Sequence, residues 1–321
     1  MPFDGTGYEG RIEALDKMDK VIDLLAGEAA MVIRAHGGDN AGHTVINSQG
    51  EFALHLVPAG IFNPGAVCVI APGIAINPAG TLALVANYRE GTVSVFTISG
   101  KTLTAAGKID FGDPKAGPAA ITFTPDGKTA LVTRDGDHRI SILAIDGSNV
   151  TDTKRVMTGG HRPYAVQVSP KGDIAVIGNQ GVNAGDIMPV NVVDLKGKAP
   201  RIVNTVDVGQ YIESLTFSND GNYLAVIPQN GSNLAPSHPF YNDHGLLVVF
   251  AVNGTTLTKV AEAKIGQWPQ GVVWSRDGKT LLAQSMVDKA IAVVSFDGKS
   301  LKVTDQINVT GGPDGIRTAG R

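Results

Sequence analysis

Cysteine, aromatic residues and charge are all scarce in this sequence of 321 residues. It contains one cysteine, 6% aromatic and 18% charged residues, and no apolar run of about 18 residues, the length that a membrane-spanning helix needs. The cysteine, Cys68, has no second cysteine with which to form an internal disulfide, and it lies in the apolar stretch VCVI, where we expect a buried, unreactive thiol. These absences favour a soluble protein without cysteine-based catalysis.

Two further absences bear on partners and location. The 27 basic and 30 acidic residues give a net charge of −3 without any basic block, so neither nucleic acid nor a membrane surface is an expected partner. Residues 1–10 lack the basic start and apolar stretch of a secretion signal. We therefore expect a cytoplasmic protein with a small-molecule ligand, although an ancestor with a longer amino terminus is compatible with export.

Glycine, in contrast, is abundant, with 40 residues or about 12% against a usual ~7%. Much of it falls in one repeated turn, whose last glycine recurs at spacings of 47, 45, 49 and 57 residues. The five turns are Asn77-Pro-Ala-Gly80, Thr124-Pro-Asp-Gly127, Ser169-Pro-Lys-Gly172, Ser218-Asn-Asp-Gly221 and Ser275-Arg-Asp-Gly278. A repeat of this period indicates a chain built from similar supersecondary units.

Each repeated unit reads as four antiparallel strands. Short alternating apolar runs such as AVQVS and DIAVIGN flank the Gly172 turn, and two further runs follow before the next unit. Four strands in each unit of about 45 residues, without helices, predict an all-β fold, a β-propeller with four-stranded antiparallel blades. Five units are complete, and a sixth inner strand begins near the carboxy terminus at Gly312.

The blade sequences also resemble a known family. The stretches LALVANYREGTVSVFTI and TPDGKTALVTRDGDHRISILAI are similar to the YVTN-type blades of lactonase-like propellers, which include 6-phosphogluconolactonase-like and carboxymuconate-cyclase-like proteins. The resemblance covers about residues 73–321 and implies a propeller fold, with a weaker expectation of lactone or ester chemistry. Members of that family usually have seven blades, so this chain has fewer units than the resemblance implies.

Residues 20–70 resemble a different family. The segments GG-x-NAGHT, LHL-x-PAGI and VCVI are similar to the amino-terminal region of adenylosuccinate synthetase, where the histidine equivalent to His43 acts as general acid. A glycine-rich phosphate loop precedes this region in that family, but Ala14, Lys17 and Asp19 stand where its glycines would be. We therefore interpret Asn40 and His43 as structural remnants and expect no synthetase activity.

We accordingly divide the chain into a synthetase-like fragment, residues 1–72, and a propeller, residues 73–321. The spacing of apolar residues in the fragment predicts one short helix, Ile12–Ala26, and strands at Ala30–Ala35, His43–Asn47, Phe52–Val57 and Ala66–Ile70. We hypothesise that these strands join Ile316–Thr318 as a sixth blade that closes the ring. The alternatives are an open five-bladed ring completed by a second subunit and a separate small domain. The chain is therefore expected to be a monomer or a homodimer.

The fusion of two unrelated sequences has two possible origins. It is either a natural gene fusion or an artefact of cloning, and the sequence is compatible with both.

The candidate site lies where loops meet at the mouth of the predicted channel. The longest insertion, residues 228–245, carries His238 and His244 beside Tyr241 and Asp243, and His161 lies on a neighbouring loop. The three histidines are candidate ligands of a divalent metal such as Zn or Ca, or general bases with Asp243 as orienting group. A solvated loop that satisfies its own backbone is the alternative. No cofactor is otherwise indicated.

Glu213 and Arg162 complete the catalytic candidates. Glu213 enters an inner strand where the sister blades carry small residues (Ala119, Ala165 and Gly271), so its carboxylate is expected to point into the channel. A simple salt bridge to Arg162 or Arg317 is the alternative. We expect the substrate pocket to be lined by aromatic and amide side chains: Tyr164, Tyr211, Tyr241, Trp268, Asn179 and Asn230.

Two functions are compatible with these residues. The first is hydrolysis of a small ester, lactone or related electrophile such as a phosphotriester, with water activated by a metal or by His161, His238 or His244. Glu213 or Asp243 would orient that base, and Arg162 would stabilise the oxyanion. The second is a propeller that binds a ligand or a protein without catalysis. No G-x-S-x-G segment is present, which argues against a serine nucleophile.

Overall fold

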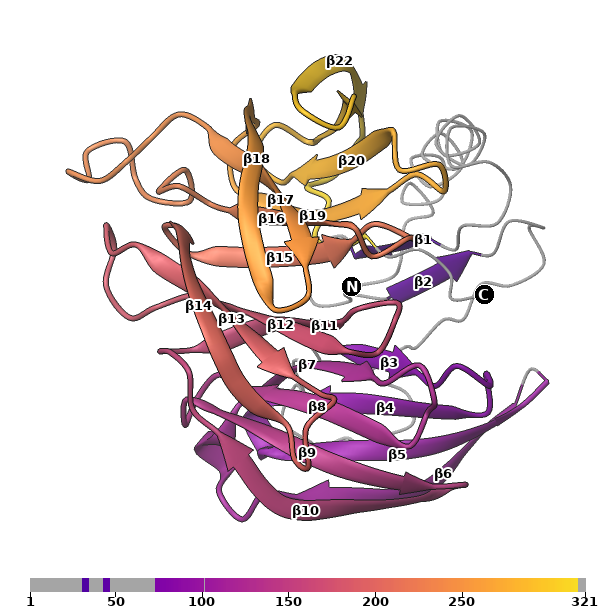
Figure 1. Cartoon of the computed structure of the whole chain (residues 1–321). Coiled ribbons are helices and arrows are strands. Elements are labelled where there is room, and N and C mark those ends of the chain that lie inside the picture. The colour runs from indigo at the N-terminus through magenta and orange to yellow at the C-terminus, as the bar shows by residue number, and fades with distance from the viewer. Residues whose placement is uncertain (1–30, 35–42, 47–72, 101, 317–321) are drawn as a thin grey trace.

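The computed structural model describes residues 31–34, 43–46, 73–100 and 102–316, with side chains from residue 73 onward. Five antiparallel four-stranded sheets follow one another along the chain, each ordered as the sequence runs. Figure 1 shows the first two sheets, which contain β3 to β10, in the lower part of the molecule and the last sheet, which contains β20 and β22, at the top. Among the described residues, helical structure is limited to two single 3-10 turns, η1 (Tyr88–Glu90) and η2 (Pro114–Ala116). The all-β propeller architecture is thereby confirmed.

The blades are built from strands β3 to β22. Blade I comprises β3 (Ile74–Ile76), β4 (Leu82–Asn87), β5 (Thr92–Ser99) and β6 (Thr102–Asp110), and blade II comprises β7 (Pro118–Phe123), β8 (Thr129–Arg134), β9 (Arg139–Asp146) and β10 (Asn149–Met157). Blade III comprises β11 (Pro163–Val168), β12 (Ile174–Asn179), β13 (Met188–Asp194) and β14 (Arg201–Gly209), and blade IV comprises β15 (Ile212–Phe217), β16 (Tyr223–Pro228), β17 (Gly245–Asn253) and β18 (Thr256–Ile265). Blade V comprises β19 (Pro269–Trp274), β20 (Thr280–Ser285), β21 (Ala290–Phe296) and β22 (Leu301–Asn308).

The repeated glycine turn joins the first and second strand of every blade. In all five turns the backbone N–H of the glycine donates to the carbonyl three residues earlier, at 2.8–3.0 Å. The glycines, Gly80, Gly127, Gly172, Gly221 and Gly278, have φ between 68° and 70°, a left-handed conformation that side chains with a Cβ adopt only at a cost. We call the side of the molecule that carries these turns the turn face.

Successive blades pack face to face, with the first strand of one blade against the first and second strands of its neighbour. Leu84 and Leu143 lie in the core between blades I and II, Phe250 lies between blades III and IV, and Trp274 lies between blades IV and V. Each of these side chains is at most 3% exposed. Burial of one such side chain stabilises a fold by roughly 1.5–3 kcal/mol, so the interfaces hold the blades in sequence.

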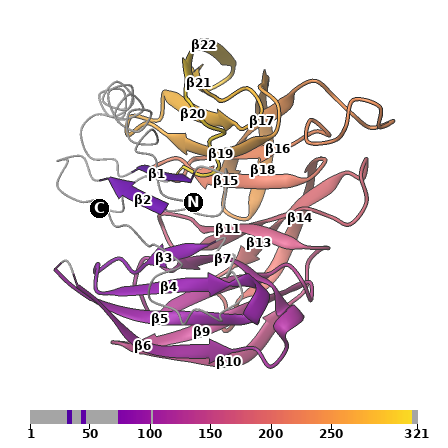
Figure 2. The ribbon, with the colours of Figure 1, turned by 180° about the vertical axis from the view of Figure 1, so that it is seen from behind.

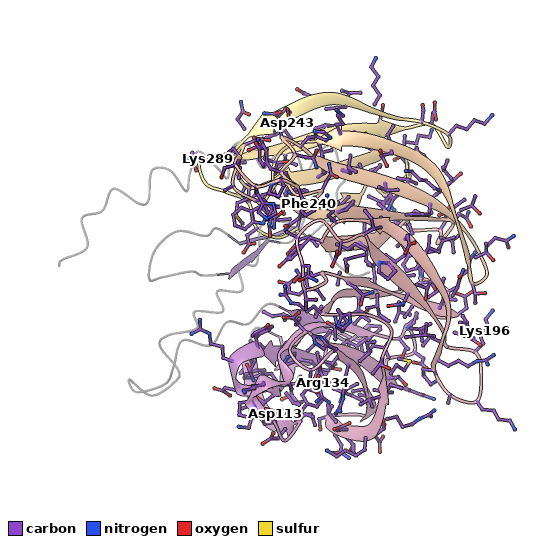
Figure 3. The ribbon with its side chains drawn as sticks, turned by 90° about the vertical axis from the view of Figure 1, so that its left-hand side faces the viewer. Asp113, Arg134, Lys196, Phe240, Asp243 and Lys289 are labelled. Carbon is purple, nitrogen blue, oxygen red and sulfur yellow. The ribbon has the colours of Figure 1, made fainter. Side chains whose placement is uncertain are left out.

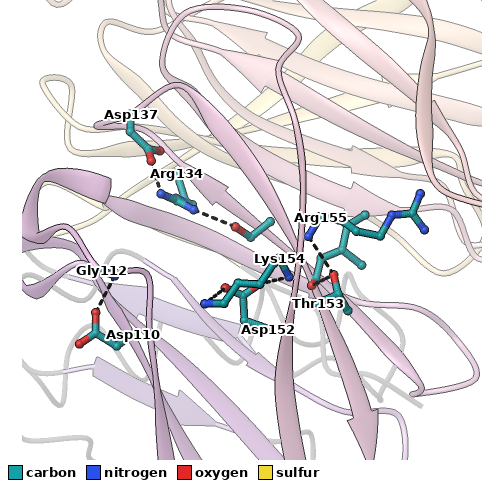
Figure 4. Close-up of polar contacts among 10 residues, drawn as sticks. Asp110, Gly112, Arg134, Asp137, Asp152, Thr153, Lys154 and Arg155 are labelled. Atoms are coloured by element: carbon teal, nitrogen blue, oxygen red, sulfur yellow. Dashed lines mark hydrogen bonds and ion pairs between the residues drawn. The ribbon is translucent and has the colours of Figure 1, made fainter.

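The outer strands carry bulges. In β10 the pairing register with β9 shifts between Asp152 and Val156, and Lys154 takes a left-handed φ of 60° while its N–H donates to the Asp152 carboxylate at 2.9 Å. At the end of β8 in the same blade, Arg134 contacts Asp137 in the β8–β9 turn and donates to Ser141 at 3.2 Å (Figure 4). The bond from Lys154 to Asp152 satisfies a backbone N–H group where the β9–β10 ladder is interrupted.

The amino-terminal fragment is described in two places only. β1 (Met31–Arg34) and β2 (His43–Ile46) form a two-stranded antiparallel sheet, which confirms strands within the predicted ranges 30–35 and 43–47. Within the described residues this pair hydrogen-bonds to none of the five blades. The predicted helix Ile12–Ala26, the strands Phe52–Val57 and Ala66–Ile70, and Cys68 fall outside the described residues.

The carboxy terminus follows blade V. Ile316 is 4% exposed and packs against Val273, Leu282 and Ile291 on the free side of that blade, while Gln284 donates to the carbonyl of Gly315 at 3.2 Å. Ile316 itself has no strand assignment, and residues 317 and 318 fall outside the described residues. The five blades are therefore established, and the sixth blade remains a hypothesis. No helix in the described part of the chain is long and apolar enough to cross a membrane.

Candidate functional site

The face opposite the turns, which we call the mouth face, is formed by loops between blades and by the connections of second to third strands. Figure 3 shows Asp113, Phe240, Asp243 and Lys289 from such loops on one side of the molecule, while Lys196, from the turn between β13 and β14, lies on the other side. Figure 2 shows the same ribbon from behind, with the blades in the same order. All candidate site residues between 161 and 268 belong to segments that reach the mouth face.

In blades II to V the residue before the inner strand has an unusual backbone. Arg162, Tyr211 and Trp268 have φ of 54°, 55° and 49°, and Gly117 occupies the same position in blade II with φ of 58°. Their carbonyls accept the N–H groups of Gln180, Gln229, Met286 and Asp135 respectively, at 2.8–3.1 Å. A left-handed conformation costs a residue other than glycine about 1–3 kcal/mol and persists only where its surroundings fix it. The fold thus holds three large side chains in a strained position at the mouth.

These positions define what we call the mouth ring. It contains the left-handed residues before β7, β11, β15 and β19, which are Gly117, Arg162, Tyr211 and Trp268. It also contains the second residues of these four strands, Ala119, Tyr164, Glu213 and Gln270, together with Asp314, which follows blade V. The residues after the second strands of the five blades complete it: Tyr88, Asp135, Gln180, Gln229 and Met286.

The pairing register corrects the expectation for Glu213. Pro118, Pro163, Ile212 and Pro269 each pair with the end of the second strand of their blade, so the equivalent of Glu213 is the residue after each proline. In blades III and V this residue is Tyr164 or Gln270, not the small Ala165 or Gly271 that the repeat pattern predicts. The sister blades therefore carry large side chains at this level, with Ala119 as the small one.

Asp135 connects three blades. It is 2% exposed and accepts a hydrogen bond from the Tyr88 hydroxyl of blade I. The guanidinium of Arg162 in blade III donates to the same carboxylate through Nε, at 2.8 Å, and through Nη2, at 3.3 Å. The guanidinium also lies over the Tyr211 ring, 5.7 Å from its centroid. Arg162 is thus paired with Asp135 rather than with Glu213, while Arg317 lies outside the described residues.

The electrostatics of this triad follow from burial and pairing. Burial, together with the neighbouring Asp135 carboxylate, raises the pKa of Tyr88 to about 12. Burial opposes the charged form of Arg162, but the hydrogen bond and the charge of Asp135 outweigh it and raise the pKa of the guanidinium above its usual value. At neutral pH the Tyr88 phenol is therefore neutral and the Arg162 guanidinium is charged.

Glu213 lies between two amides. Its Oε2 accepts hydrogen bonds from Nε2 of Gln180, at 3.0 Å, and from Nε2 of Gln229, at 2.9 Å. Burial, followed by the charge of Asp314, raises the pKa of Glu213 to about 8. Glu213 is thus half-buried, with two amides and a second carboxylate as its neighbours, and its expected direction into the channel stays a prediction.

Asp314 extends the ring past blade V. In the amide orientation that satisfies both partners, Gln270 donates to Asp314 Oδ1 at 2.9 Å and accepts from the Trp268 indole N–H at 2.8 Å. Trp268 is 37% exposed at the mouth, and its backbone N–H donates to Ser232 Oγ at 2.9 Å. A partly exposed aromatic side chain therefore lies on the mouth face at blade V, outside the walls of the cavity described below.

A shallow cavity of about 160 Å³ lies between the mouth loops of blades III and IV. Its walls are residues 181–185 and residues 231, 233 and 234, and Arg162, Gln210 and Tyr211 complete it. The Phe240 ring packs so closely on the backbone of Gly185 that a Cβ on Gly185 would lie 2.5 Å from a ring carbon. This contact joins the mouth loop of blade III to that of blade IV. The volume is below the roughly 300–1,000 Å³ of sites for drug-sized ligands, so the cavity fits a small molecule.

The structure does not bring the candidate histidines together. His161 packs edge-on against His138 with ring centroids 5.2 Å apart, and Nδ1 of His238 accepts the N–H of Phe240 at 3.2 Å. His244 contacts Asp243 at 2.6 Å, and this hydrogen bond lowers the pKa of the exposed Asp243 carboxylate. In the described part of the chain, no group of three or more His, Cys, Asp or Glu side chains could hold a metal ion.

The remaining pocket candidates have different environments. Asn179 is fully buried and donates to the Pro189 carbonyl and to Asn191, both at 2.8 Å, so it supports blade III rather than lining the cavity. Asn230 donates to the carbonyl of His244 at 3.2 Å, and the Tyr241 hydroxyl accepts from Gln267 at 3.0 Å. Tyr164 lies in the mouth ring, and its carbonyl accepts from Thr133 at 2.6 Å. Of the six candidates, only Tyr211 lines the cavity.

Several ring residues are not among those that the sequence predicts. Asp135 follows a strand as part of an ordinary Asp-Gly turn, and Gln180 and Gln229 are single amides that belong to no motif. One signal for them is present: alignment of the second-strand ends places Tyr88, Asp135, Gln180 and Gln229 at the same level. Divergence at one level of otherwise similar repeats is a mark of a site rather than of the scaffold.

Comparisons with known proteins confirm both resemblances. Residues 18–104 match the family model described as adenylosuccinate synthetase. The adenylosuccinate synthetase of Dehalococcoides mccartyi is 61% identical over 59 residues, which cover 18% of this chain and 14% of the synthetase. The chain thus spans about a seventh of the length of the curated relatives that it matches. The family match runs past residue 73 and overlaps β3 to β5 and the start of β6, which the structure places in blade I, so the predicted boundary at residues 72 and 73 stays a prediction.

The propeller part matches the family model described as lactonase, 7-bladed beta-propeller, over residues 101–213. A candidate 6-phosphogluconolactonase from Bacteroides uniformis superposes with a TM-score of 0.66 and 18% identity, covering 91% of this chain and 100% of that one. The periplasmic gluconolactonase of Pseudomonas aeruginosa superposes with a TM-score of 0.65 and 15% identity, covering 91% and 99%. At these identities the solved structures establish the shared fold alone.

Proposed function

We propose that this lactonase-like propeller hydrolyses a small lactone or ester at the mouth face, with Glu213 as the general base. One observation carries the proposal: two amide donors hold Glu213 on an inner strand, two residues after Tyr211, which lines the mouth-face cavity together with Arg162. The family match and the gluconolactonase named above support a hydrolase.

The proposed reaction uses Glu213, one water molecule and the charge of Arg162. The Glu213 carboxylate takes a proton from a water molecule as the water oxygen attacks the carbonyl carbon. The C–O bond to the leaving oxygen then breaks, and that oxygen takes the proton back from Glu213, which gives a hydroxy acid from a lactone or an acid and an alcohol from an ester. Arg162 at the cavity wall supplies positive charge near the developing oxyanion, as the sequence predicts.

The two amides explain how the carboxylate is positioned. Both donate to the same oxygen, Oε2, so the group keeps one orientation whether or not it is ionised. Since the pKa of Glu213 is raised to about 8, the base is mostly protonated at neutral pH. The rate should therefore rise with pH and level off above about pH 8.

Glu213→Gln tests the proposal against a panel of lactones, carboxylic esters and phosphotriesters. The substitution keeps the shape and both acceptor contacts, so the fold is retained while kcat falls about 100- to 10,000-fold. Glu262→Gln, the same change on the exposed outer strand β18, is the matched control and should keep full activity. Wild-type protein without turnover on the panel, or a Glu213→Gln variant as active as wild type, would overturn the assignment.

A further inference from the structure

The mouth ring has the wrong charge for an anionic substrate. Among its described positions, the guanidinium of Arg162 is outnumbered by three carboxyl groups, those of Asp135, Glu213 and Asp314. Even with Glu213 protonated, the remaining carboxylates outnumber the cation. A phosphate monoester carries about two negative charges near neutral pH, so its approach to this ring is opposed.

Arg162 is also occupied. Two of its N–H groups already donate to the buried carboxylate of Asp135, at 2.8 and 3.3 Å. Recognition of phosphate by arginine uses the same paired donors. To bind phosphate in this way, Arg162 would have to leave Asp135 buried with an unpaired charge, which is strongly destabilising.

The buried amides point to a different ligand group. Gln180 is 3% and Gln229 is 1% exposed, and both use their nitrogen to donate to Glu213. Their carbonyl oxygens, Oε1, are buried and have no hydrogen-bond partner among the residues that the structure describes. A buried acceptor requires a donor, which a hydroxyl group or a water supplies and a phosphate dianion does not.

We propose that the site takes an uncharged, hydroxyl-bearing lactone and rejects its phosphorylated counterpart. This inference rests on the proposed function for the reaction, but the charge selection is a property of binding. Among the solved structures of similar fold are a gluconolactonase and a candidate 6-phosphogluconolactonase, and the ring of this chain matches the chemistry of the unphosphorylated type of substrate.

Two measurements test the inference separately from catalysis. Hydrolysis of glucono-1,5-lactone and of its 6-phosphate gives the kcat/KM ratio, which should favour the unphosphorylated lactone at least tenfold. Glucose and glucose 6-phosphate are not hydrolysed, so their binding, measured by NMR saturation transfer, gives the same selectivity in the absence of a reaction. Selective binding of glucose without turnover of either lactone would overturn the proposed function and support the charge selection.

Asp314→Asn then locates the selection in the ring. Removal of this carboxylate should lower the preference for the unphosphorylated member of each pair at least threefold. Asp305→Asn, which removes one charge from the exposed outer strand β22, is the control and should leave the preference unchanged. A wild-type protein that binds or hydrolyses the phosphorylated member equally well or better would overturn the inference, as would an equal effect of the two substitutions.

Discussion

The two faces of the propeller differ in how strictly the repeat is kept. On the turn face each blade has the same turn, with the glycine at φ 68–70° and, in three blades, an Asp that accepts from a Ser or Thr hydroxyl at 2.6 Å. On the mouth face, equivalent positions hold Gly117, Arg162, Tyr211 or Trp268. Repetition therefore marks the scaffold, and divergence at a fixed backbone position marks the site.

The largest effect on stability is expected where mouth loops touch. A Cβ on Gly136 would lie 1.9 Å from the carbonyl oxygen of Lys115, whereas one on Gly278 of the turn face meets nothing within 4 Å. We expect Gly136→Ala to cost about 3 kcal/mol because backbone must move, and Gly278→Ala to cost about 1–2 kcal/mol from its left-handed φ alone. Urea denaturation of both variants measures the difference, and equal costs would contradict the distinction.

Acid should weaken the turn face. The hydrogen bond from Thr124 lowers the pKa of Asp126, and that from Ser275 lowers the pKa of Asp277. Because the pKa values in the folded protein lie below the ordinary value of 3.8, this stabilisation is complete above about pH 4 and is lost as the pH falls through the folded values. Unfolding followed between pH 2 and 6 should show this loss, and Asp126→Asn and Asp277→Asn should reduce its slope.

The mouth face should respond in the opposite direction. Because the pKa of Glu213 is raised from 4.5 to about 8, its contribution is complete below about pH 4.5 and is lost as the pH rises towards 8. Glu213→Gln should therefore remove an alkaline decline in stability while it abolishes turnover. A wild-type stability that does not fall between pH 5 and 8 would contradict the strained carboxyl.

The smallest effect concerns a strained lysine on a mouth loop. Lys289 has φ of 51° in the loop between β20 and β21. Lys289→Gly should stabilise the fold by about 0.5–1 kcal/mol because glycine adopts this conformation without steric cost. Lys302→Gly in the exposed strand β22 should have the opposite sign, and thermal unfolding measures both. A destabilised Lys289→Gly variant would show that the loop does not strain this residue.

Local patterns in the amino-acid sequence determine the blades of this protein. Alternating apolar runs separated by turns that end in glycine specify strands and their order, because each turn requires a left-handed residue that only glycine supplies cheaply. The same pattern places Glu213 on the inner strand of one blade and Arg162 directly before the inner strand of the preceding blade. These features depend on neighbours in sequence, and the structure agrees with them.

Contacts between blades are decided by the tertiary structure alone. The bond of Asp135 to both Tyr88 and Arg162, the two amides on Glu213 and the distribution of the histidines depend on how adjacent sheets pack, which no local pattern encodes. In the inner strands the pairing register shifts after the first residue. The side chains that lie at the same level as Glu213 therefore differ from those that the repeat pattern predicts. The sequence by itself therefore determined the repeated scaffold, whereas packing between repeats decided which side chains meet, because residues distant in sequence acquire a common environment only when the blades are assembled.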